Sequence, residues 1–512
     1  MAYSVLLRIR TDILENCMKK HIVTVALALS LIAGTSSGCG LMVVNDLSGE
    51  LKLDENKNIV SEENTAPAEP ETVTPFTPYE EKDYDAQIEK YLTALPDLKF
   101  GGTTVFFTSP SLSYLEPDSV ENAVSQMAYE RNRELEDRYE ISISASEKDA
   151  SMMLEDAKNA VAAGTYYTDF LMVPLYMMGH FKSAGILENL RSLPYLDLDQ
   201  PYFYSESAEA FSAGYTAWGI SGYASVAQND LSAVYFNKDL VRQAGMDMPY
   251  DLVYDGKWTW DALYTYVTAV QELNGQAESP RYYTVTAQNT ASRLADLVFA
   301  SCDNSFVLSG EMLIPSIAFT AESAAPAIEL ASRIFADERS ITDDTAGAAG
   351  CFSRGESMFL VDYVYVASWL TNSAADWGML PMPKLMEADD HRTLVSNTSL
   401  VFTVPLGTVN NELASILLSA INAASYGRLN DAYVKHGMIY TLRDNDSINM
   451  LDLLLDTAAF DFSLAFGSAY PNIAAGTYSL VRECAKAGTI PSDFESRSSK
   501  ANMVLAEYFP LG

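Results

Sequence analysis

The chain has 512 residues, of which 33 are Lys or Arg and 68 are Asp or Glu, so its formal net charge is −35. Its hydrophobic content of 48% and charged content of 20% are typical of a globular protein, and its length allows more than one domain. Because nucleic acids and anionic membrane surfaces are recognised mainly through Lys and Arg, this charge argues against both as binding partners.

Residues 1–39 predict a secretory signal that ends in a lipidated cysteine. A short basic start is followed by the apolar run 22–32, and small residues then lead to Cys39. The run is too short for a transmembrane helix, which needs about 20 residues. Small residues directly before a cysteine resemble the lipobox of bacterial lipoproteins, so we expect Cys39 to be acylated. Residues 1–17 precede a better start at Met18 and are interpreted as a mis-called start.

Residues 40–100 are predicted to be a tether between the lipid anchor and a folded body. The segment is acidic and rich in proline, and its few apolar residues cannot offset the entropy of ordering it. Proline stiffens such a segment and like charges extend it, so it would hold the folded body away from the membrane.

From residue 101 onward, strands and helices alternate as in a parallel sheet covered on both faces, which predicts the α/β class. In chain order we predict a strand at 103–108, a helix from about 118 to 139, a strand at 141–144, a helix at 152–163 and a strand at 170–173. Asp118, with Glu121 three residues later, is the predicted cap of the first helix. Further on we predict helices at 260–273, 325–335 and 412–426, and strands at 357–361 and 398–405.

Motifs for nucleotide, metal or nucleophile chemistry are missing from the predicted mature chain. Residues 34–38 match GxSxG, but they lie within the predicted signal. Asp444 and Asp446 resemble the start of a calcium loop, yet Ile448 and Asn449 stand where an oxygen ligand and a glycine are needed. We therefore predict no catalytic residue, metal or cofactor. The remaining cysteines are odd in number and widely spaced, which predicts buried thiols at Cys302, Cys351 and Cys484.

Aromatic residues in predicted loops are the best candidates for ligand binding. Aromatic faces stack on the C–H faces of sugar rings, and a few oriented polar groups add hydrogen bonds. We expect Tyr202, Phe203, Trp218 and Tyr223 on one side of a ligand cleft, and Asp362, Tyr363 and Tyr365 on the other. The alternative is that each ring packs within a lobe. Trp258 and Trp260 are expected to pack, because Thr259 resembles a helix N-cap.

Six short stretches carry a resemblance to a known family. They are YERNRELEDRY at 129–139, FNKDL at 236–240, PYDLV at 249–253, GKWTWD at 256–261, GESMF at 355–359 and DWGMLPMPK at 376–384. They resemble the extracellular solute-binding lipoproteins of ABC importers, family 1, which are usually described as sugar-binding. The resemblance runs from about residue 101 to the end of the chain, and its central block is the most specific part.

The resemblance implies a two-lobed fold of the periplasmic-binding-protein type II, with a ligand cleft between the lobes. The first lobe would comprise residues 101–234 and 386–430, and the second residues 235–385 and 431–512. The protein would be a monomeric receptor, lipid-anchored on the extracellular face of the cell membrane. It would close on a saccharide and deliver it to the transmembrane subunits of an ABC permease.

Two departures from the family pattern leave the ligand open. Many relatives have PWW where this chain has Pro201, Tyr202 and Phe203, and residues 222–224 replace a frequent GDL. A surface-anchored glycoside hydrolase that uses two of the many carboxylates is an alternative function. An adhesion or scaffold protein whose cleft has lost its ligand is another.

Overall fold

The computed structural model describes residues 82–511, except 117–119, 121, 226–227, 277–280, 288–290, 341–344, 435–437 and 439–440. The chain divides into two units, residues 1–73 and 74–512, and the described residues all belong to the second. The predicted signal and most of the predicted tether therefore lie outside the described residues. None of the helices within the described part is both long and apolar enough to cross a membrane.

The first lobe is built on a four-stranded sheet with the strand order β14-β3-β1-β2. Its strands are β1 (Thr103–Ser109), β2 (Ile141–Glu147), β3 (Phe170–Pro174) and β14 (Leu400–Thr403). β1 runs parallel to β2 and β3, whereas β14 is antiparallel to β3. All four strands overlap predicted ones, and they are short, apolar and bounded by turns, as buried strands are.

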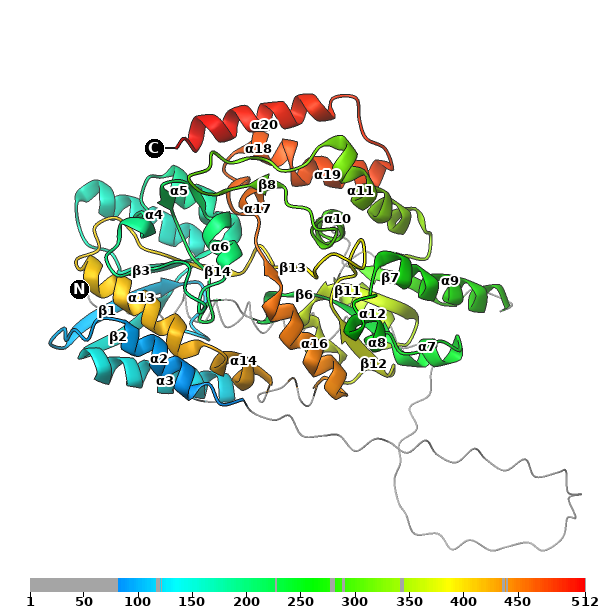
Figure 1. Cartoon of the computed structure of the whole chain (residues 1–512), viewed down its shortest axis with the longest axis horizontal. Helices are drawn as coiled ribbons and strands as arrows, with labels where there is room; N and C mark the ends of the chain where they lie inside the picture. Colours follow the sequence, from blue (N-terminus) through cyan, green and yellow to red (C-terminus); the bar gives the residue numbers. More distant parts are fainter. Residues whose placement is uncertain are drawn as a thin grey trace, which may run out of the picture. The chain divides into compact units, whose positions relative to one another are not determined.

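Helices cover both faces of this sheet, as the alternation of side chains along a strand requires. Phe170 and Met172 join an apolar cluster with α2 (Asp85–Ala94), α3 (Ala123–Tyr139) and α13 (Asn411–Ser425). Leu171 and Val173 point the other way, into a cluster with α4 (Ala150–Ala163). In Figure 1, α2, α3 and α13 lie side by side and α4 lies across the sheet from them.

A second four-stranded sheet, in the order β12-β6-β11-β7, forms the other lobe. Its strands are β6 (Ser232–Asn237), β7 (Tyr283–Ala287), β11 (Ser357–Tyr363) and β12 (Trp377–Leu380). β7 and β11 are parallel, and β6 is antiparallel to β11 and β12. Phe359 and Val361 face α9 (Trp260–Gln276), α10 (Ala291–Ser301) and α11 (Ala321–Ala336), whereas Leu360 faces the opposite cluster.

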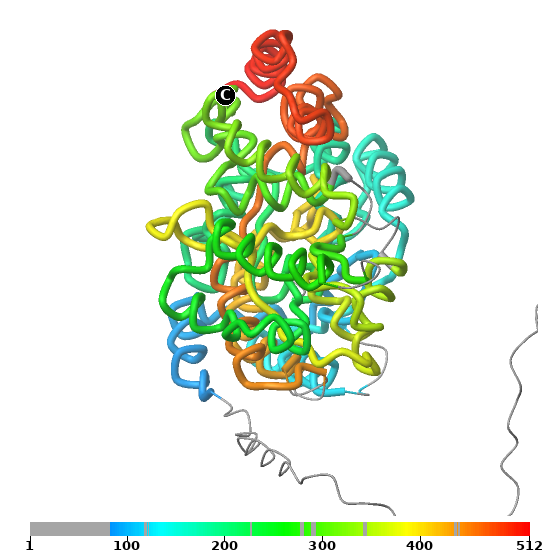
Figure 2. The backbone as a smooth tube through the Cα atoms, turned by 90° about the vertical axis from the view of Figure 1, so that its right-hand side faces the viewer, coloured from blue at the N-terminus to red at the C-terminus, as the bar shows by residue number. Residues whose placement is uncertain are grey.

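The carboxyl-terminal helices contact both lobes. They are α14 (Arg428–Tyr433), α16 (Asn445–Asp456), α17 (Phe462–Phe466), α18 (Pro471–Gly476), α19 (Tyr478–Ala487) and α20 (Phe494–Tyr508). α19 packs on α10 and α11 of the second lobe, whereas α17 packs on α5 (Met178–Ser183) of the first. Figure 2 shows α18, α19 and α20 together at one end of the body. Helices of the segment 431–512 therefore pack on both lobes, whereas the family resemblance implies that this segment belongs to the second lobe.

Shorter elements complete the described chain. The helices are α6 (Ser205–Ala210), α7 (Lys238–Gln243), α8 (Tyr250–Tyr254) and α12 (Thr345–Ser353), and the 3-10 turns are η1 (Leu175–Met177), η2 (Leu190–Ser192), η3 (Gln228–Asp230) and η4 (Val364–Leu370). The short strands are β4 (Ser212–Gly214), β5 (Thr216–Ala217), β8 (Val307–Leu308), β9 (Gly310–Glu311), β10 (Ser316–Ile317), β13 (Thr393–Leu394) and β15 (Ala458–Ala459). β13 pairs with β15, so two segments that run between the lobes lie side by side.

Two boundaries differ from the sequence predictions. The predicted tether runs to residue 100, but α2 lies within it and buries Ile88 and Leu92 in the core of the first lobe. Apolar side chains four residues apart lie on one face of a helix, and this face of α2 packs on the lobe. The cap of α3 is Asn122, whose side chain accepts a hydrogen bond from the backbone N–H of Ser125. The predicted cap at Asp118 and Glu121 lies outside the described residues.

We predict that Leu92→Ala destabilises the whole folded body, because Leu92 is fully buried and removing a buried leucine side chain costs about 2–5 kcal/mol. Lys90→Ala, an exposed position on the same helix, should change the unfolding free energy by less than about 0.5 kcal/mol. Urea unfolding followed by circular dichroism measures both. Equal stabilities of the two variants would show that α2 is not part of the cooperative unit.

Candidate functional site

The ends of strands from both sheets converge where the chain crosses between the lobes. In the first sheet, the carboxyl end of β3 lies beside the amino end of β14, because Pro174 pairs with Leu400. In the second sheet, the carboxyl end of β11 lies beside the amino end of β6, because Tyr363 pairs with Ser232. Ligands of α/β sheets bind outside the carboxyl ends of parallel strands, so this junction is the candidate site.

Asp230 stands at the centre of the junction, at the end of η3. Its backbone carbonyl accepts a hydrogen bond from the N–H of Ser396 at 2.8 Å, in the segment that leads to β14. The next carbonyl, that of Leu231, accepts from the N–H of Val364 at 2.9 Å, directly after β11. Backbone from both lobes is thus joined within two residues of the Asp230 side chain.

The Asp230 carboxylate is only partly solvated. Burial raises the pKa of Asp230 to about 6, although a hydrogen bond from Thr398 and the positive charge of Arg293 oppose the shift. The hydroxyl of Thr398 lies 3.3 Å from Oδ1 of Asp230. A carboxylate in this state gains most from a ligand that brings hydrogen-bond donors.

Asp362, at the end of β11, is a second carboxylate at this junction and is 2% exposed. Its Oδ1 accepts a hydrogen bond from the N–H of Tyr363 at 2.8 Å, whereas its buried Oδ2 has no hydrogen-bond partner among the described residues. Burial raises the pKa of Asp362 to about 6, and the Arg293 charge lowers it. Asp362 and Arg293 line a small hollow of about 10 Å³, close to the space of one water molecule.

Arg293, in the first turn of α10, is the basic residue that links these acids. Its charge lowers the pKa of Asp230, Asp362 and Tyr363 against the effect of burial. Its guanidinium carbon lies 4.9 Å from the ring centroid of Tyr363, within cation–π range. The arrangement therefore combines two carboxylates, one guanidinium and an aromatic face.

Tyrosines from different elements adjoin Asp230. The Tyr433 hydroxyl, at the end of α14, donates to Oδ1 of Asn229, and Asn229 also hydrogen-bonds with Tyr114 in the loop after β1. Burial and the nearby Asp230 charge raise the pKa of Tyr114 to about 12. Burial also raises the pKa of Tyr433, so both phenols stay protonated in the physiological range and can donate hydrogen bonds.

Exposed aromatic rings lie at the same strand ends. Tyr365 packs edge-on against Trp369 in η4, with ring centroids 5.6 Å apart, and lies nearly parallel to Tyr363 at 6.5 Å. Trp369 is 52% exposed, and Tyr176, directly after β3 in the first lobe, is 40% exposed. Large exposed rings at a polar junction suit the stacking of a flat, hydroxylated ligand.

The structure places the predicted site residues in different surroundings. Asp362, Tyr363 and Tyr365 lie together at the junction, although the Tyr363 ring is 4% exposed and belongs to the core of the second lobe. Tyr202 and Phe203, at 2% and 4% exposure, lie in the core of the first lobe, where the Tyr202 ring packs edge-on against Tyr91 at 5.3 Å. They pack within the lobe, which is the alternative that the sequence left open, and we leave them out of the candidate site.

Trp218 and Tyr223 also lie away from Asp362. The Trp218 ring packs against Phe466 and Phe509, so it binds the carboxyl-terminal helices to the first lobe. Tyr223 stacks on Tyr204 at 5.5 Å and lines a separate hollow beside α16.

Most of the polar groups at the junction were not predicted from the sequence. They are Tyr114, Asn229, Asp230, Arg293, Thr398 and Tyr433. For Asp230 a usable signal existed, because an acid directly before the apolar strand 232–237 falls at a strand end. Arg293 and Tyr433 carry no such signal, since their places depend on how α10 and α14 dock.

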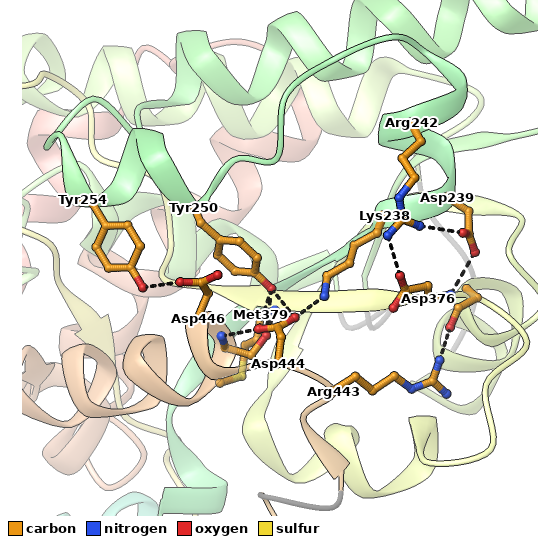
Figure 3. Close-up of polar contacts among 12 residues, drawn as sticks. Lys238, Asp239, Arg242, Tyr250, Tyr254, Asp376, Met379, Arg443, Asp444 and Asp446 are labelled. Carbon is orange, nitrogen blue, oxygen red and sulfur yellow. Dashed lines mark hydrogen bonds and ion pairs between the residues drawn. The ribbon is translucent and has the colours of Figure 1, made fainter. Parts of the chain in front are cut away.

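Figure 3 shows a polar network elsewhere on the second lobe, around the sequence that resembled a calcium loop. Asp444 caps α16, and its Oδ1 accepts from the N–H of Ser447 at 2.6 Å. Its Oδ2 accepts from Nζ of Lys238 and from the hydroxyl of Tyr250. The carboxylate thus serves a helix cap and an ion pair. Within the described residues, no group of three His, Cys, Asp or Glu side chains is placed to hold a metal ion.

A larger hollow, of about 700 Å³, lies on the first lobe between α3 and α14. Its walls carry Lys82, Arg428 and several acids, but none of the strand-end residues. Volume alone would favour this hollow, whereas the convergence of buried charges and strand ends favours the junction. We therefore take the strand-end junction as the candidate site.

Two α/β lobes joined by crossing segments, with buried polar groups at the facing strand ends, define a two-lobed ligand-binding protein. The chain belongs to the bacterial extracellular solute-binding protein family, whose sequence profile matches residues 122–414, more than half of its length. None of the curated proteins shows a significant match to the sequence.

Solved structures share the fold at low sequence identity. The maltose-binding protein MalE of Listeria monocytogenes, in complex with maltose, is 13% identical, with a TM-score of 0.52 over 79% of this chain and 98% of its own. A cyclo/maltodextrin-binding protein with maltotetraose is 12% identical, with a TM-score of 0.52 over 80% and 98%. The galacto-N-biose/lacto-N-biose I-binding protein of Bifidobacterium longum, with lacto-N-biose, is 12% identical, with a TM-score of 0.51 over 80% and 98%. These likenesses show the two-lobed fold.

We predict that Asp362→Asn stabilises the ligand-free protein at neutral pH. A carboxyl whose pKa is raised to about 6 by burial is ionised at neutral pH at a cost in stability. This cost fades as the pH falls from about 6 towards about 4, the pKa in the unfolded chain. The variant should gain about 1–2 kcal/mol at pH of about 7.5 and much less at about 4.5.

Urea unfolding at the two pH values measures this gain. Asp493→Asn, an exposed position, is the control and should shift the unfolding free energy little at either pH. A gain for Asp362→Asn that does not depend on pH would contradict the raised pKa.

Proposed function

We propose that the protein is the saccharide-binding component of an ABC importer. The observation that carries this proposal is the convergence of Asp230, Arg293 and Asp362 beside the aromatic rings of Tyr365 and Trp369. Stacking surfaces and charge-assisted hydrogen bonds are the two interactions that a hydroxylated ring needs in water. The sugar ligands of the structural relatives support the same class of ligand.

In this proposal, the ligand holds the lobes in the closed arrangement. Tyr176, Asp230 and Thr398 would contact it from the first lobe. Asp362, Tyr365 and Trp369 would contact it from the second. Shifting a hinge equilibrium from 1:99 to 99:1 takes about 5.5 kcal/mol of differential affinity. A ligand that binds with micromolar affinity releases about 8 kcal/mol, which is enough. The closed form would then be recognised by the permease.

The proposed location is the outer face of the cell membrane. The apolar run and small residues before Cys39 support a lipid anchor, and the acidic segment after it supports a tether that ends near α2. The strong net negative charge suits a soluble receptor that is repelled by anionic surfaces. The folded body would therefore depend on the lipid alone to remain at the membrane.

We predict that a panel of mono- and oligosaccharides contains a ligand that raises the melting temperature and gives a stoichiometric heat of binding. Asp230→Asn and Trp369→Ala should each lower the affinity for that ligand at least tenfold, about 1.4 kcal/mol, because each alters a direct contact. Tyr202→Phe keeps a buried ring in the first-lobe core and should leave the affinity unchanged. Isothermal titration calorimetry measures all three variants.

A panel without any thermal shift or heat would refute the saccharide class. Hydrolysis of a bound oligosaccharide would instead make the protein a glycoside hydrolase, so the ligand recovered after titration is examined by mass spectrometry. Equal loss of affinity in Tyr202→Phe and Asp230→Asn would place the site in the first-lobe core.

We further predict that Cys39→Ala releases the protein from cells into the medium, because acylation of this cysteine is the only membrane attachment proposed. Fractionation of cells and medium, followed by immunoblotting, measures the change. Cys351→Ala, at a buried position of the folded body, is the matched control and should stay with the membrane. Retention of Cys39→Ala at the membrane would contradict the anchor.

A further inference from the structure

A second hollow, of about 120 Å³, lies between the first lobe and α16. Three aromatic rings line it, those of Tyr84, Tyr223 and Tyr426. The Tyr426 ring is 4.7 Å from Tyr223 and 5.9 Å from Tyr84, centroid to centroid, and the last pair is perpendicular. Tyr204 stacks behind Tyr223 at an interplanar angle of 12°, which fixes that ring.

Backbone geometry holds this aromatic arrangement together. Gly427 joins α13 to α14 with φ of +69°, in the left-handed region. A Cβ at this position would lie 2.3 Å from the Tyr84 ring, so only glycine lets that ring close over the turn. Tyr84 is in turn held by α2, which is buried against α13. The rings are therefore built into the fold and do not depend on loose surface side chains.

Two acceptor groups of the hollow accept no hydrogen bond from the described residues. Asn430 is 6% exposed, and its Nδ2 donates to Oδ1 of Asp452 at 2.7 Å. Its Oδ1 is buried and accepts no hydrogen bond from the described residues. Asp456 lies at the exposed rim, and its carboxylate makes no hydrogen bond or ion pair with the described residues. Partial desolvation at the rim and the neighbouring charge of Asp452 raise the pKa of Asp456.

One ammonium group already lies at the rim of this hollow. Nζ of Lys82 is 3.0 Å from Oδ2 of Asp452. The second carboxylate, Asp456, still faces the hollow, so the lining carries one cation against two anions. The remaining field is negative, and it acts beside three aromatic faces, whose quadrupoles also attract cations.

This hollow is separate from the strand-end junction. It shares no lining residue with the group formed by Asp230, Arg293 and Asp362. Tyr223 and Tyr426 come from the first lobe, whereas Asp452 and Asp456 come from α16, which packs on β12 of the second. A ligand here would therefore touch elements of both lobes without entering the candidate saccharide site.

We propose that the hollow formed by Tyr84, Tyr223, Tyr426, Asn430 and Asp456 binds an organic ammonium ion. Aromatic faces and a carboxylate attract the cation, and the unused amide oxygen of Asn430 accepts a hydrogen bond from an N–H or hydroxyl group of the ligand. A neutral ligand of the same shape would leave the charge of Asp456 uncompensated. The proposal goes beyond the capture of a saccharide and does not depend on it.

Choline is the probe, and its neutral isostere 3,3-dimethyl-1-butanol is the matched ligand control. Broadening of the choline methyl resonance on titration with the intact protein measures binding. We expect choline to bind at least fivefold more tightly than the alcohol, a difference within the range of cation–π and charge attraction. Equal binding of the two molecules, or no broadening by choline at millimolar concentration, overturns the proposal.

Variants assign the binding to this hollow. Tyr223→Leu removes one π face, and Asp456→Asn removes the unpaired charge. Each should lower the choline affinity about threefold to fivefold, roughly 1 kcal/mol or less. Tyr223→Phe keeps the ring and should bind normally, as should Asp446→Asn at the other end of α16. Asp456→Asn changes an exposed side chain and should fold. It therefore decides the test if Tyr223→Leu fails to fold.

Choline affinity unchanged in Asp456→Asn overturns the assignment. Asp362→Asn separates this site from the candidate saccharide site, because it alters only the latter and should leave choline affinity unchanged. Loss of choline binding in Asp362→Asn would place the ion in the strand-end junction and also overturn the proposal. The failure of a saccharide panel, by contrast, would not bear on the choline result.

Discussion

The structure depends on the backbone hydrogen bonds that tie the crossing segments together at Asp230 and Leu231. They join the strand that enters the second lobe to the segment that returns to the first and to the turn after β11. Since β6 and β14 are antiparallel to their neighbours, the chain enters each sheet at the edge where the parallel strands end. Both sheets therefore present their carboxyl ends to one place.

This geometry removes charged groups at the junction from water, which costs desolvation free energy. Two carboxylates lose much of their hydration there, and burial raises the pKa of each to about 6. One guanidinium, that of Arg293, compensates them only in part. Groups whose pKa values are strongly shifted by burial and by nearby charges cluster at functional sites. The same reasoning applies on a smaller scale to the hollow beside α16, where an amide oxygen and a carboxylate face aromatic rings.

Aromatic residues show that the local sequence does not predict which rings are buried in a lobe and which face the other lobe. Tyr365 and Tyr202 occur in similar surroundings of tyrosine and phenylalanine, and the sequence offers no way to tell them apart. Tyr365 follows a strand whose end faces the other lobe, whereas Tyr202 is covered by α2 and α13. The difference arises because α2 comes from a segment, 85–94, that was predicted as part of an acidic tether but packs on the lobe through the buried side chains of Ile88 and Leu92.

The sequence by itself determined the α/β alternation, the strands and helices with strong apolar periodicity, and the family. These depend on local patterns of side chains, which are the same whatever lies opposite them. Tertiary structure alone decided which polar groups meet. Asp230, Arg293 and Asp362 are separated by more than sixty residues at each step, and their proximity follows from antiparallel strand pairing and from the docking of α10. Long-range packing sets such distances, and no local pattern encodes them.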